Sequence, residues 1–231
     1  KPLYYAQTAR GLLFASQDKA LLASGWVSSD LEPAGLAGFY LWGSVPEPWT
    51  LYRDVFALPA GHWLRVRTSE RVTGPVCWYD LRVHWQGPNN TIAPQDLEGQ
   101  VRQAVRDSVR AHLVSDVPVS VFLSGGVDSG SIAGLATELG AQVEGITISF
   151  EEFAGRLDDE VPAARTIATH YGLKHHVRQV TRTEFAQDLP LIREAMDQPS
   201  IDGINTWFAS KAAAERGYKV VLSGVGGDEL L

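Results

Sequence analysis

Two glycine-rich turns carry the residue types in this chain that are best suited to chemistry. The first is SGGVDS, which runs from Ser124 to Ser129 and follows the apolar run VSVFL. Adjacent glycines let the backbone approach a ligand closely, and the amides that open a helix present donors and a positive dipole end to an anion. The turn therefore predicts a phosphate site, with Ser124, Gly125, Gly126 and Ser129 as its contacts.

The same turn differs from the Walker type, which needs a lysine after its second glycine. Here Gly126 is followed by Val127 and Asp128. An aspartate beside phosphates repels them unless a divalent cation lies between, so we expect Asp128 to be a Mg²⁺ ligand. The plain alternative is a glycine turn that only joins a strand to a helix.

The second turn closes the printed sequence as VVLSGVGGDELL. Ser223 and Gly224 follow a second apolar run, and Asp228 comes shortly after them. In an open parallel sheet, ligands bind beyond the carboxyl ends of the strands, where such turns converge. We therefore expect Asp128 and Asp228 to hold one Mg²⁺ from two sides, with the metal bridging phosphate oxygens.

The elements that must position these turns alternate along the second part of the chain. Apolar periodicity predicts helices over residues 95–114, 128–139 and 159–171, a helix pair within 184–216, and strands over 118–123, 143–149, 174–180 and 218–222. This alternation is typical of an α/β fold with a parallel sheet and right-handed crossovers.

The first part of the chain reads as α+β. Short strands are expected over Leu3–Gln7, Leu12–Ser16 and His62–Val66, and helices near Asp18–Ser24 and Pro33–Gly43. Residues 86–94 are rich in turn formers and predict a linker. The expected organisation is a domain over 1–85, the linker, and an α/β domain over 95–231.

Composition narrows the function classes. The net charge of −7 and the absence of a basic run argue against nucleic-acid binding. No apolar stretch approaches membrane-spanning length, and the first residues do not resemble a signal peptide. The single cysteine, Cys77, excludes an internal disulfide framework and fits a reducing cytoplasm.

These motifs carry a family resemblance in chain order. SGGVDS resembles the pyrophosphate-binding loop of the PP-loop ATP pyrophosphatases, the N-type nucleotide α-hydrolases. SGVGGDE and LDDEVPAARTIATHYGLKHH are similar to segments in the synthetase domain of glutamine-dependent asparagine synthetases. KPLYYA, LLFASQDKALLAS and TLYRDVFALPAGHWLRV resemble the second half of the Ntn-type, class II glutaminase domain that precedes it.

The resemblance implies a ligase that uses ATP and Mg²⁺. It would transfer AMP to a small carboxylate, with aspartate favoured, release pyrophosphate, and form an amide with ammonia derived from glutamine. By the same resemblance, Asp128 and Asp228 are the catalytic metal ligands. The residues expected around the adenosine are Leu123, Ile148, Ser223 and Gly224. For Ile148, an ordinary core position is an equal alternative.

One departure leaves the acceptor open. Recognised members of the resembled family carry SGEG in the second turn, whereas this chain has Val225 at the glutamate position. A PP-loop enzyme that adenylates another carboxylate, such as a peptide or β-lactam cyclase, is therefore an alternative. A non-catalytic nucleotide-binding descendant is the third hypothesis, and the retention of Asp128 and Asp228 argues against it.

The ends of the sequence suggest a fragment of a longer protein. Glutaminases of the resembled class use an N-terminal cysteine, which this sequence lacks, so glutamine hydrolysis by this chain alone is not expected. Cys77 is interpreted as a packing residue. The oligomeric state is left open, a homodimer included.

Two further groups have competing interpretations. Asp158, Asp159 and Glu160 precede a helical pattern and either favour its N-terminus or line a catalytic mouth. His175 and His176 are neighbours on a predicted strand, so their side chains should face opposite ways. A metal site shared by the two histidines is therefore not expected.

Overall fold

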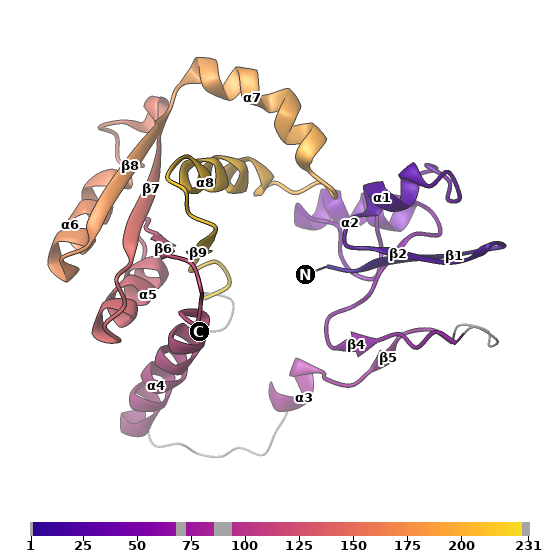
Figure 1. Cartoon of the computed structure of the whole chain (residues 1–231), viewed down its shortest axis with the longest axis horizontal. Helices are drawn as coiled ribbons and strands as arrows, with labels where there is room; N and C mark the ends of the chain where they lie inside the picture. The colour runs from indigo at the N-terminus through magenta and orange to yellow at the C-terminus, as the bar shows by residue number, and fades with distance from the viewer. Residues whose placement is uncertain (1, 68–72, 86–93, 228–231) are drawn as a thin grey trace. The chain divides into compact units, whose positions relative to one another are not determined.

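The computed structural model describes residues 2–67, 73–85 and 94–227 (Figure 1). The chain divides into two compact units. The first comprises residues 1–90 with 192–203, and the second comprises residues 91–191 with 204–231. The segment 192–203 thus belongs to the first unit although residues of the second unit flank it on both sides. Sequence periodicity does not predict this exchange.

The first unit has small antiparallel sheets and short helices. One sheet has the strand order β2-β1-β3, and a second pairs β4 with β5. The strands are β1 (Tyr4–Thr8), β2 (Gly11–Ala15), β3 (Phe56–Ala57), β4 (His62–Trp63) and β5 (Val76–Cys77). The helices are α1 (Asp18–Ala23), α2 (Pro33–Trp42) and α3 (Leu81–Trp85). The predicted α+β character is confirmed, although the strand expected over His62–Val66 ends at Trp63.

The core of this unit forms between β1, β3 and α1. Alternate residues of β1, Tyr4 and Ala6, are buried, as a strand with one covered face requires. They pack with Leu21 of α1 and with Val55 and Ala57.

Side chains of the 192–203 segment, which is far from α1 in the sequence, form hydrogen bonds at the start of that helix. The Asp197 carboxylate accepts hydrogen bonds from the backbone N–H groups of Asp18 (3.0 Å) and Lys19 (3.3 Å). Gln198 donates to the carboxyl of Asp18 and accepts from the backbone N–H of Leu51 at 3.0 Å. Because Gln17, the residue before α1, makes no side-chain cap, Asp197 supplies acceptors that the helix start needs.

The second unit is built on one parallel sheet with the strand order β8-β7-β6-β9. Its strands are β6 (Val119–Phe122), β7 (Glu144–Phe150), β8 (Lys174–Val180) and β9 (Val220–Leu222). Its helical elements are α4 (Pro94–His112), α5 (Val127–Glu138), the short 3-10 turn Glu151–Phe153, α6 (Val161–Tyr171), α7 (Arg182–Ala195) and α8 (Gly203–Glu215). Helix α7 runs from the second unit into the first at residue 192.

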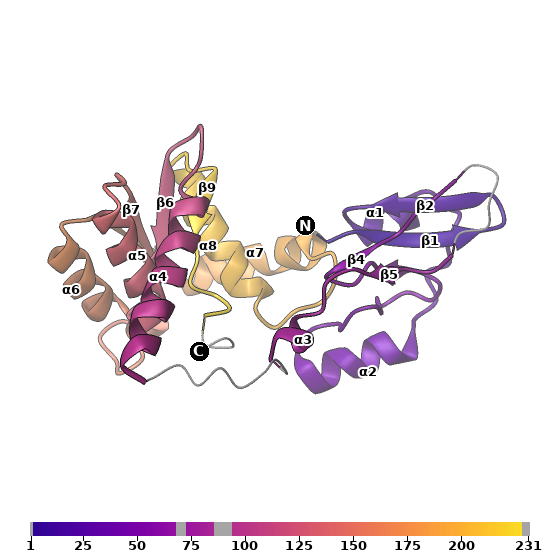
Figure 2. The same cartoon turned by 90° about the horizontal axis from the view of Figure 1, so that it is seen from below.

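Helices cover both faces of this sheet (Figure 2). On one face, Val109 of α4, Ala133 of α5 and Ala164 of α6 join a core with Val121 and Leu123. On the other face, the α8 residues Ala212 and Ala213 pack on Ile146 of β7. The predicted α/β class with a parallel sheet is confirmed. Apolar runs in β6 and β7 reflect burial on both faces.

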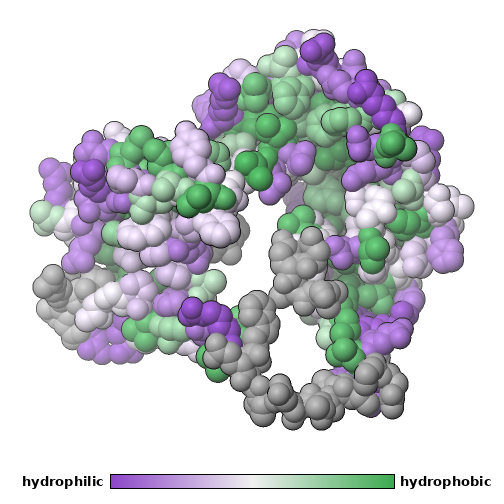
Figure 3. Space-filling view, turned by 180° about the vertical axis from the view of Figure 1, so that it is seen from behind, coloured by the Kyte–Doolittle hydropathy of each residue, from purple (hydrophilic) through white to green (hydrophobic). Residues whose placement is uncertain are grey.

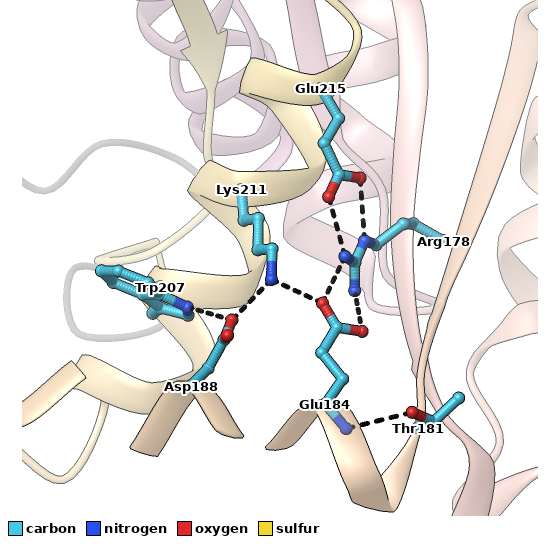
Figure 4. Close-up of polar contacts among 7 residues, drawn as sticks. All are labelled: Arg178, Thr181, Glu184, Asp188, Trp207, Lys211 and Glu215. Atoms are coloured by element: carbon cyan, nitrogen blue, oxygen red, sulfur yellow. Dashed lines mark hydrogen bonds and ion pairs between the residues drawn. The ribbon is translucent and has the colours of Figure 1, made fainter. Parts of the chain in front are cut away.

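An ion network fastens α7 and α8 to the edge strand β8 (Figure 4). Arg178 of β8 pairs with Glu184 of α7 at 2.5 Å and with Glu215 of α8 at 2.8 Å. Lys211 of α8 pairs with Glu184 at 2.7 Å and with Asp188 of α7 at 2.6 Å. The network thereby sets the position of α8, the helix that leads into β9.

Hydrophilic side chains are interspersed with hydrophobic ones on the face drawn in Figure 3. Among the described residues, no helix combines the length and the apolar character that crossing a membrane requires.

Candidate nucleotide site

The two glycine-rich turns lie at one edge of the parallel sheet. Strands β6 and β9 are hydrogen-bonded neighbours with Val119 opposite Val220 and Val121 opposite Leu222. Both strands end toward the same edge because they are parallel, so Ser124 and Ser223 begin their turns side by side. The predicted convergence of the two turns is confirmed.

Internal hydrogen bonds shape the first turn. The hydroxyls of Ser124 and Ser129 are 2.9 Å apart, and the Ser124 hydroxyl also accepts from the Gly126 N–H at 3.2 Å. The Ser129 hydroxyl in turn accepts from the Ser124 N–H at 3.2 Å. Gly126 precedes α5 without a side-chain cap. The N–H groups that open α5 therefore lack a capping side chain, as an anion-binding helix start requires.

Glycines are needed here because the backbone segments approach one another closely. A Cβ on Gly125 would lie 2.6 Å from the Ala163 Cβ of α6. A Cβ on Gly224 would lie 2.9 Å from the Asp128 Cβ, and one on Gly227 would lie 2.9 Å from the Asp128 Cγ. The second turn thus packs directly against the aspartate of the first.

Asp128 presents a carboxylate that suits a hard cation. Within residues 2–67, 73–85 and 94–227, no hydrogen bond or ion pair engages this side chain, although it is only partly exposed. Its oxygens are the ligand type that Mg²⁺ prefers. The second expected ligand, Asp228, lies outside the described residues. A cluster of three or more His, Cys, Asp or Glu side chains able to hold a metal does not occur among the described residues.

The residues expected around the adenosine line the same edge. Leu123 is buried, with 1% of its surface exposed, Ile148 is half-buried, and Ser223 is exposed. Thr147, which precedes Ile148 in β7, donates to the Leu123 carbonyl at 2.5 Å. Pattern reading missed Thr147, because a threonine within an apolar strand looks like an ordinary core residue.

Val225 lies exposed in the second turn, with 92% of its surface accessible. Its backbone N–H donates to the Ser223 hydroxyl at 3.3 Å, and Gly226 takes a positive φ of 93°. A positive φ is a backbone conformation that favours glycine, because glycine has no Cβ to clash. The turn therefore presents an apolar side chain to solvent at the edge where Asp128 lies.

In the acidic stretch before α6, one side chain forms hydrogen bonds with backbone N–H groups. The Asp159 carboxylate accepts from the N–H groups of Gly155 at 2.8 Å and Val161 at 3.1 Å, and these bonds lower its pKa. This agrees with the helix-start interpretation of the stretch. The backbone of Asp159 also donates to the Arg156 carbonyl at 3.1 Å, which closes a compact loop.

The two neighbouring histidines face opposite ways, as predicted. His175 Nε2 lies 2.7 Å from the Thr147 hydroxyl, whereas His176 Nε2 lies 2.7 Å from a Glu144 carboxylate oxygen. Burial lowers the pKa of His175, and the positive charge of Arg165 acts in the same direction. His175 is thereby favoured in its neutral form.

The packing interpretation of Cys77 is wrong. Its thiol is exposed on β5 and contacts the Tyr79 carbonyl at 3.5 Å. The strand is only two residues long, pairs with His62 and Trp63, and has both of its residues exposed.

Each of the two parts of the chain matches a known protein family. The family model for asparagine synthase matches residues 100–231, and the model for a glutamine amidotransferase domain matches residues 1–77. The predicted domain boundaries, 1–85 and 95–231, are compatible with these ranges and stay a prediction, because the first unit also includes 192–203.

Curated relatives match the whole chain. An asparagine synthetase [glutamine-hydrolyzing] 1 of Bacillus subtilis is 30% identical over 100% of this chain and 35% of its own length. A putative asparagine synthetase of Mycobacterium bovis is 33% identical with the same coverages, and a Penicillium rubens protein named amidase chyE is 28% identical over 99% of this chain. The chain spans about a third of the length of these relatives.

Proposed function

Because the chain belongs to the asparagine synthase family, we propose that it carries the nucleotide site of an enzyme that uses ATP to convert a carboxylate into an amide. The observation that supports this most directly is the contact between the two turns, in which Gly224 and Gly227 pack on Asp128. An ATP-dependent amide synthesis needs a phosphate cradle and a charge partner at one place, and this edge of the sheet offers both.

In the proposed reaction, a carboxylate oxygen attacks the α-phosphorus of ATP. The bond from the α-phosphorus to the bridging oxygen of the β-phosphate breaks, and pyrophosphate leaves. Ammonia then attacks the acyl carbon, the bond from that carbon to the phosphate oxygen of AMP breaks, AMP departs, and the nitrogen releases one proton to solvent to leave the amide. We favour aspartate as the carboxylate and glutamine as the source of ammonia, because relatives of this chain are named asparagine synthetases [glutamine-hydrolyzing].

The chain's own groups have distinct roles in this proposal. The backbone N–H groups of Gly125, Gly126 and the first turn of α5, with the hydroxyls of Ser124 and Ser129, bind the β- and γ-phosphates. Asp128 and Asp228 would hold Mg²⁺, which supplies positive charge to the phosphate oxygens when it is bound. Leu123, Ile148, Ser223 and Gly224 form the adenosine surface.

A second candidate keeps the adenylation step and changes the acceptor. Val225 exposes an isopropyl group at this edge, where it can neither accept a proton nor pair with a cation. This is the reason to consider an acceptor with an apolar portion as the alternative to aspartate. The relative named as an amidase adds a reason to assay more than one carboxylate.

The test is release of pyrophosphate from ATP and Mg²⁺, with and without aspartate, glutamine or ammonia. Replacing Asp128 by asparagine should lower the rate at least about a hundredfold, since a lost metal ligand removes several kcal/mol of charge stabilisation. Asp107→Asn is the matched control, because Asp107 lies on the exposed side of α4 and pairs with Arg110.

Two outcomes separate the candidates. Pyrophosphate release that depends on aspartate and yields asparagine would establish the favoured acceptor. Release that depends on Asp128 but ignores aspartate would direct the search to other carboxylates. Equal rates in Asp128→Asn and Asp107→Asn would contradict the proposed role of this edge.

A further inference from the structure

A short hydrogen-bonded relay connects β8 to the start of the first glycine-rich turn. The Thr147 hydroxyl oxygen lies 2.5 Å from the Leu123 carbonyl oxygen and 2.7 Å from His175 Nε2. Thr147 and Leu123 are both buried, with 2% and 1% of their surfaces exposed. Polar groups in such a place need partners, because water cannot reach them.

The direction of the relay follows from the hydrogens available. A carbonyl oxygen can only accept, and a threonine hydroxyl has a single hydrogen to give. The Thr147 hydroxyl must therefore donate to the Leu123 carbonyl. His175 must then donate to Thr147 from a protonated Nε2, which assigns the tautomer of the neutral ring.

The relay acts on one peptide group, the one between Leu123 and Ser124. This group is planar, so its carbonyl and its N–H turn together. Thr147 holds the carbonyl, and the Ser129 hydroxyl at the start of α5 holds the N–H at 3.2 Å. The peptide that opens the turn is thus fixed from both sides, by β7 and β8 on one and by α5 on the other.

The packing leaves room for this arrangement. Gly145 of β7 lies opposite His175 in the strand register. A Cβ on Gly145 would lie 3.2 Å from Leu123 Cδ2 and 3.6 Å from His175 Cδ2. The missing side chain at residue 145 therefore lets the His175 ring and the Leu123 side chain approach from two neighbouring strands.

We infer that His175 is a positioning residue for the nucleotide site. It holds the Thr147 hydroxyl, which orients the Leu123–Ser124 peptide and with it the Ser124 hydroxyl and the amides that follow. This inference rests on the proposed function, since it assigns His175 to the phosphate site proposed above. Among the described residues, no hydrogen bond joins His175 to either turn, so its influence passes through Thr147.

The neighbouring histidine provides a matched control. His176 is one residue away, and its ring pairs with Glu144 on the opposite side of the strand. His175→Ala and His176→Ala therefore remove the same side chain from the same strand, and only the first disrupts the relay.

The first experiment measures Mg·ATP binding and steady-state pyrophosphate release. Thr147→Val should raise the dissociation constant for Mg·ATP about tenfold, the typical effect of leaving a buried carbonyl without its partner. His175→Ala should raise it in the same direction, because the Thr147 hydroxyl then loses the donor that holds it toward the Leu123 carbonyl. His175→Gln should recover most of the affinity, because a glutamine amide can donate from a similar place. The variant that combines His175→Ala with Thr147→Val should bind Mg·ATP no more weakly than Thr147→Val alone, because both residues act through the hydrogen bond from Thr147 to the Leu123 carbonyl.

The pH dependence separates positioning from proton transfer. The neutral ring in the assigned tautomer and the charged ring both carry a hydrogen on Nε2, so nucleotide affinity should not change as His175 titrates. An activity that falls as His175 titrates, with the pH dependence lost in His175→Gln, would show acid–base chemistry instead and overturn the positioning role.

The second experiment does not require nucleotide. Hydrogen exchange of the peptide covering residues 119–130 should speed up in His175→Ala and Thr147→Val and stay unchanged in His176→Ala. Unchanged exchange in both relay variants would overturn the inference even if ATP binds. Faster exchange in a protein that binds no Mg·ATP would support the relay and count against the proposed function, so the two failures are distinguishable.

Discussion

Replacing Asp18 by asparagine should destabilise the protein at acid pH and stabilise it at neutral to mildly alkaline pH. The Asp18 side chain is fully buried, and one of its oxygens, Oδ1, has no hydrogen-bond partner among the described residues. Burial, together with the hydrogen bond and the charge of Asp197, raises the pKa of Asp18 from 3.8 to about 8. The folded protein therefore keeps a proton on Asp18 at neutral pH.

The magnitude follows from that pKa. In the unfolded chain Asp18 ionises near 3.8, so at pH 7 keeping the proton in the fold costs roughly 4 kcal/mol at ~1.4 kcal/mol per pH unit. The contribution of protonated Asp18 to the unfolding free energy is fully present below pH 3.8 and is lost as the pH rises toward 8. Asparagine has no proton to lose, so this part of the pH dependence should disappear.

Asparagine also brings a cost that is independent of pH. Its amide can donate to Asp197 and accept from Gln198, but its second N–H is left buried without a partner, at about 1–3 kcal/mol. Asp18→Asn should therefore be less stable than the parent at pH 4 and about 2 kcal/mol more stable at pH 7 to 8. The groups that face this carboxyl are Lys19, Asp197 and the phenols of Tyr4 and Tyr52, whose pKa values are raised.

Urea unfolding at pH 4, 6 and 8, with hydrogen exchange of residues 17–24 as a local readout, measures the crossover. Asp197→Asn is the comparison, because it removes an acceptor from the two N–H groups at the start of α1 and should destabilise at every pH. If Asp18→Asn were destabilising by the same amount from pH 4 to 8, Asp18 would be ionised in the fold, and the reasoning from a retained proton would fail.

Two further substitutions probe the second unit. Gly224→Ala should weaken Mg·ATP binding at least about tenfold, because its Cβ would press on Asp128 and the Ser129 amide, whereas Gly99→Ala on α4 meets open space and should raise thermal stability slightly. Lys211→Met should lower the unfolding free energy by about 1–2 kcal/mol, since Glu184 and Asp188 lose their shared cation. In the parent, the pKa of Glu184 is lowered to about 2, so its stabilisation is present above 4.5 and lost as the pH falls. In Lys211→Met, acid unfolding monitored by circular dichroism should begin at higher pH.

The second unit was predictable because its elements follow from local patterns. Apolar runs bounded by turn residues placed β6 and β7 within one residue of the observed ends, and the periodicity of residues 95–114 identified α4. The parallel sheet then followed from the alternation of strands and helices. Two turns that each begin with Ser-Gly could be brought together on that basis, without knowledge of any contact.

The attachment of residues 192–203 to the first unit could not be predicted in this way. It depends on Asp197 and Gln198 meeting Asp18, about 180 residues earlier in the chain. Asp18 itself looks like an ordinary acidic residue at a helix start, where an ionised side chain is usual. Only the burial of its carboxyl and the approach of a second one reveal that it holds a proton.

The relay of His175 shows why the site could be predicted only in part. The sequence places Leu123 before the turn and His175 on a later strand, but their connection depends on register. Strands β7 and β8 pair so that Gly145 lies opposite His175, and Thr147 reaches across to the end of β6. A shift of one residue in that register would turn His175 to the face that His176 occupies and bring Glu144, in place of Thr147, within reach of the ring. The phosphate turn is thus encoded locally, whereas the orientation of its first peptide depends on how three strands align.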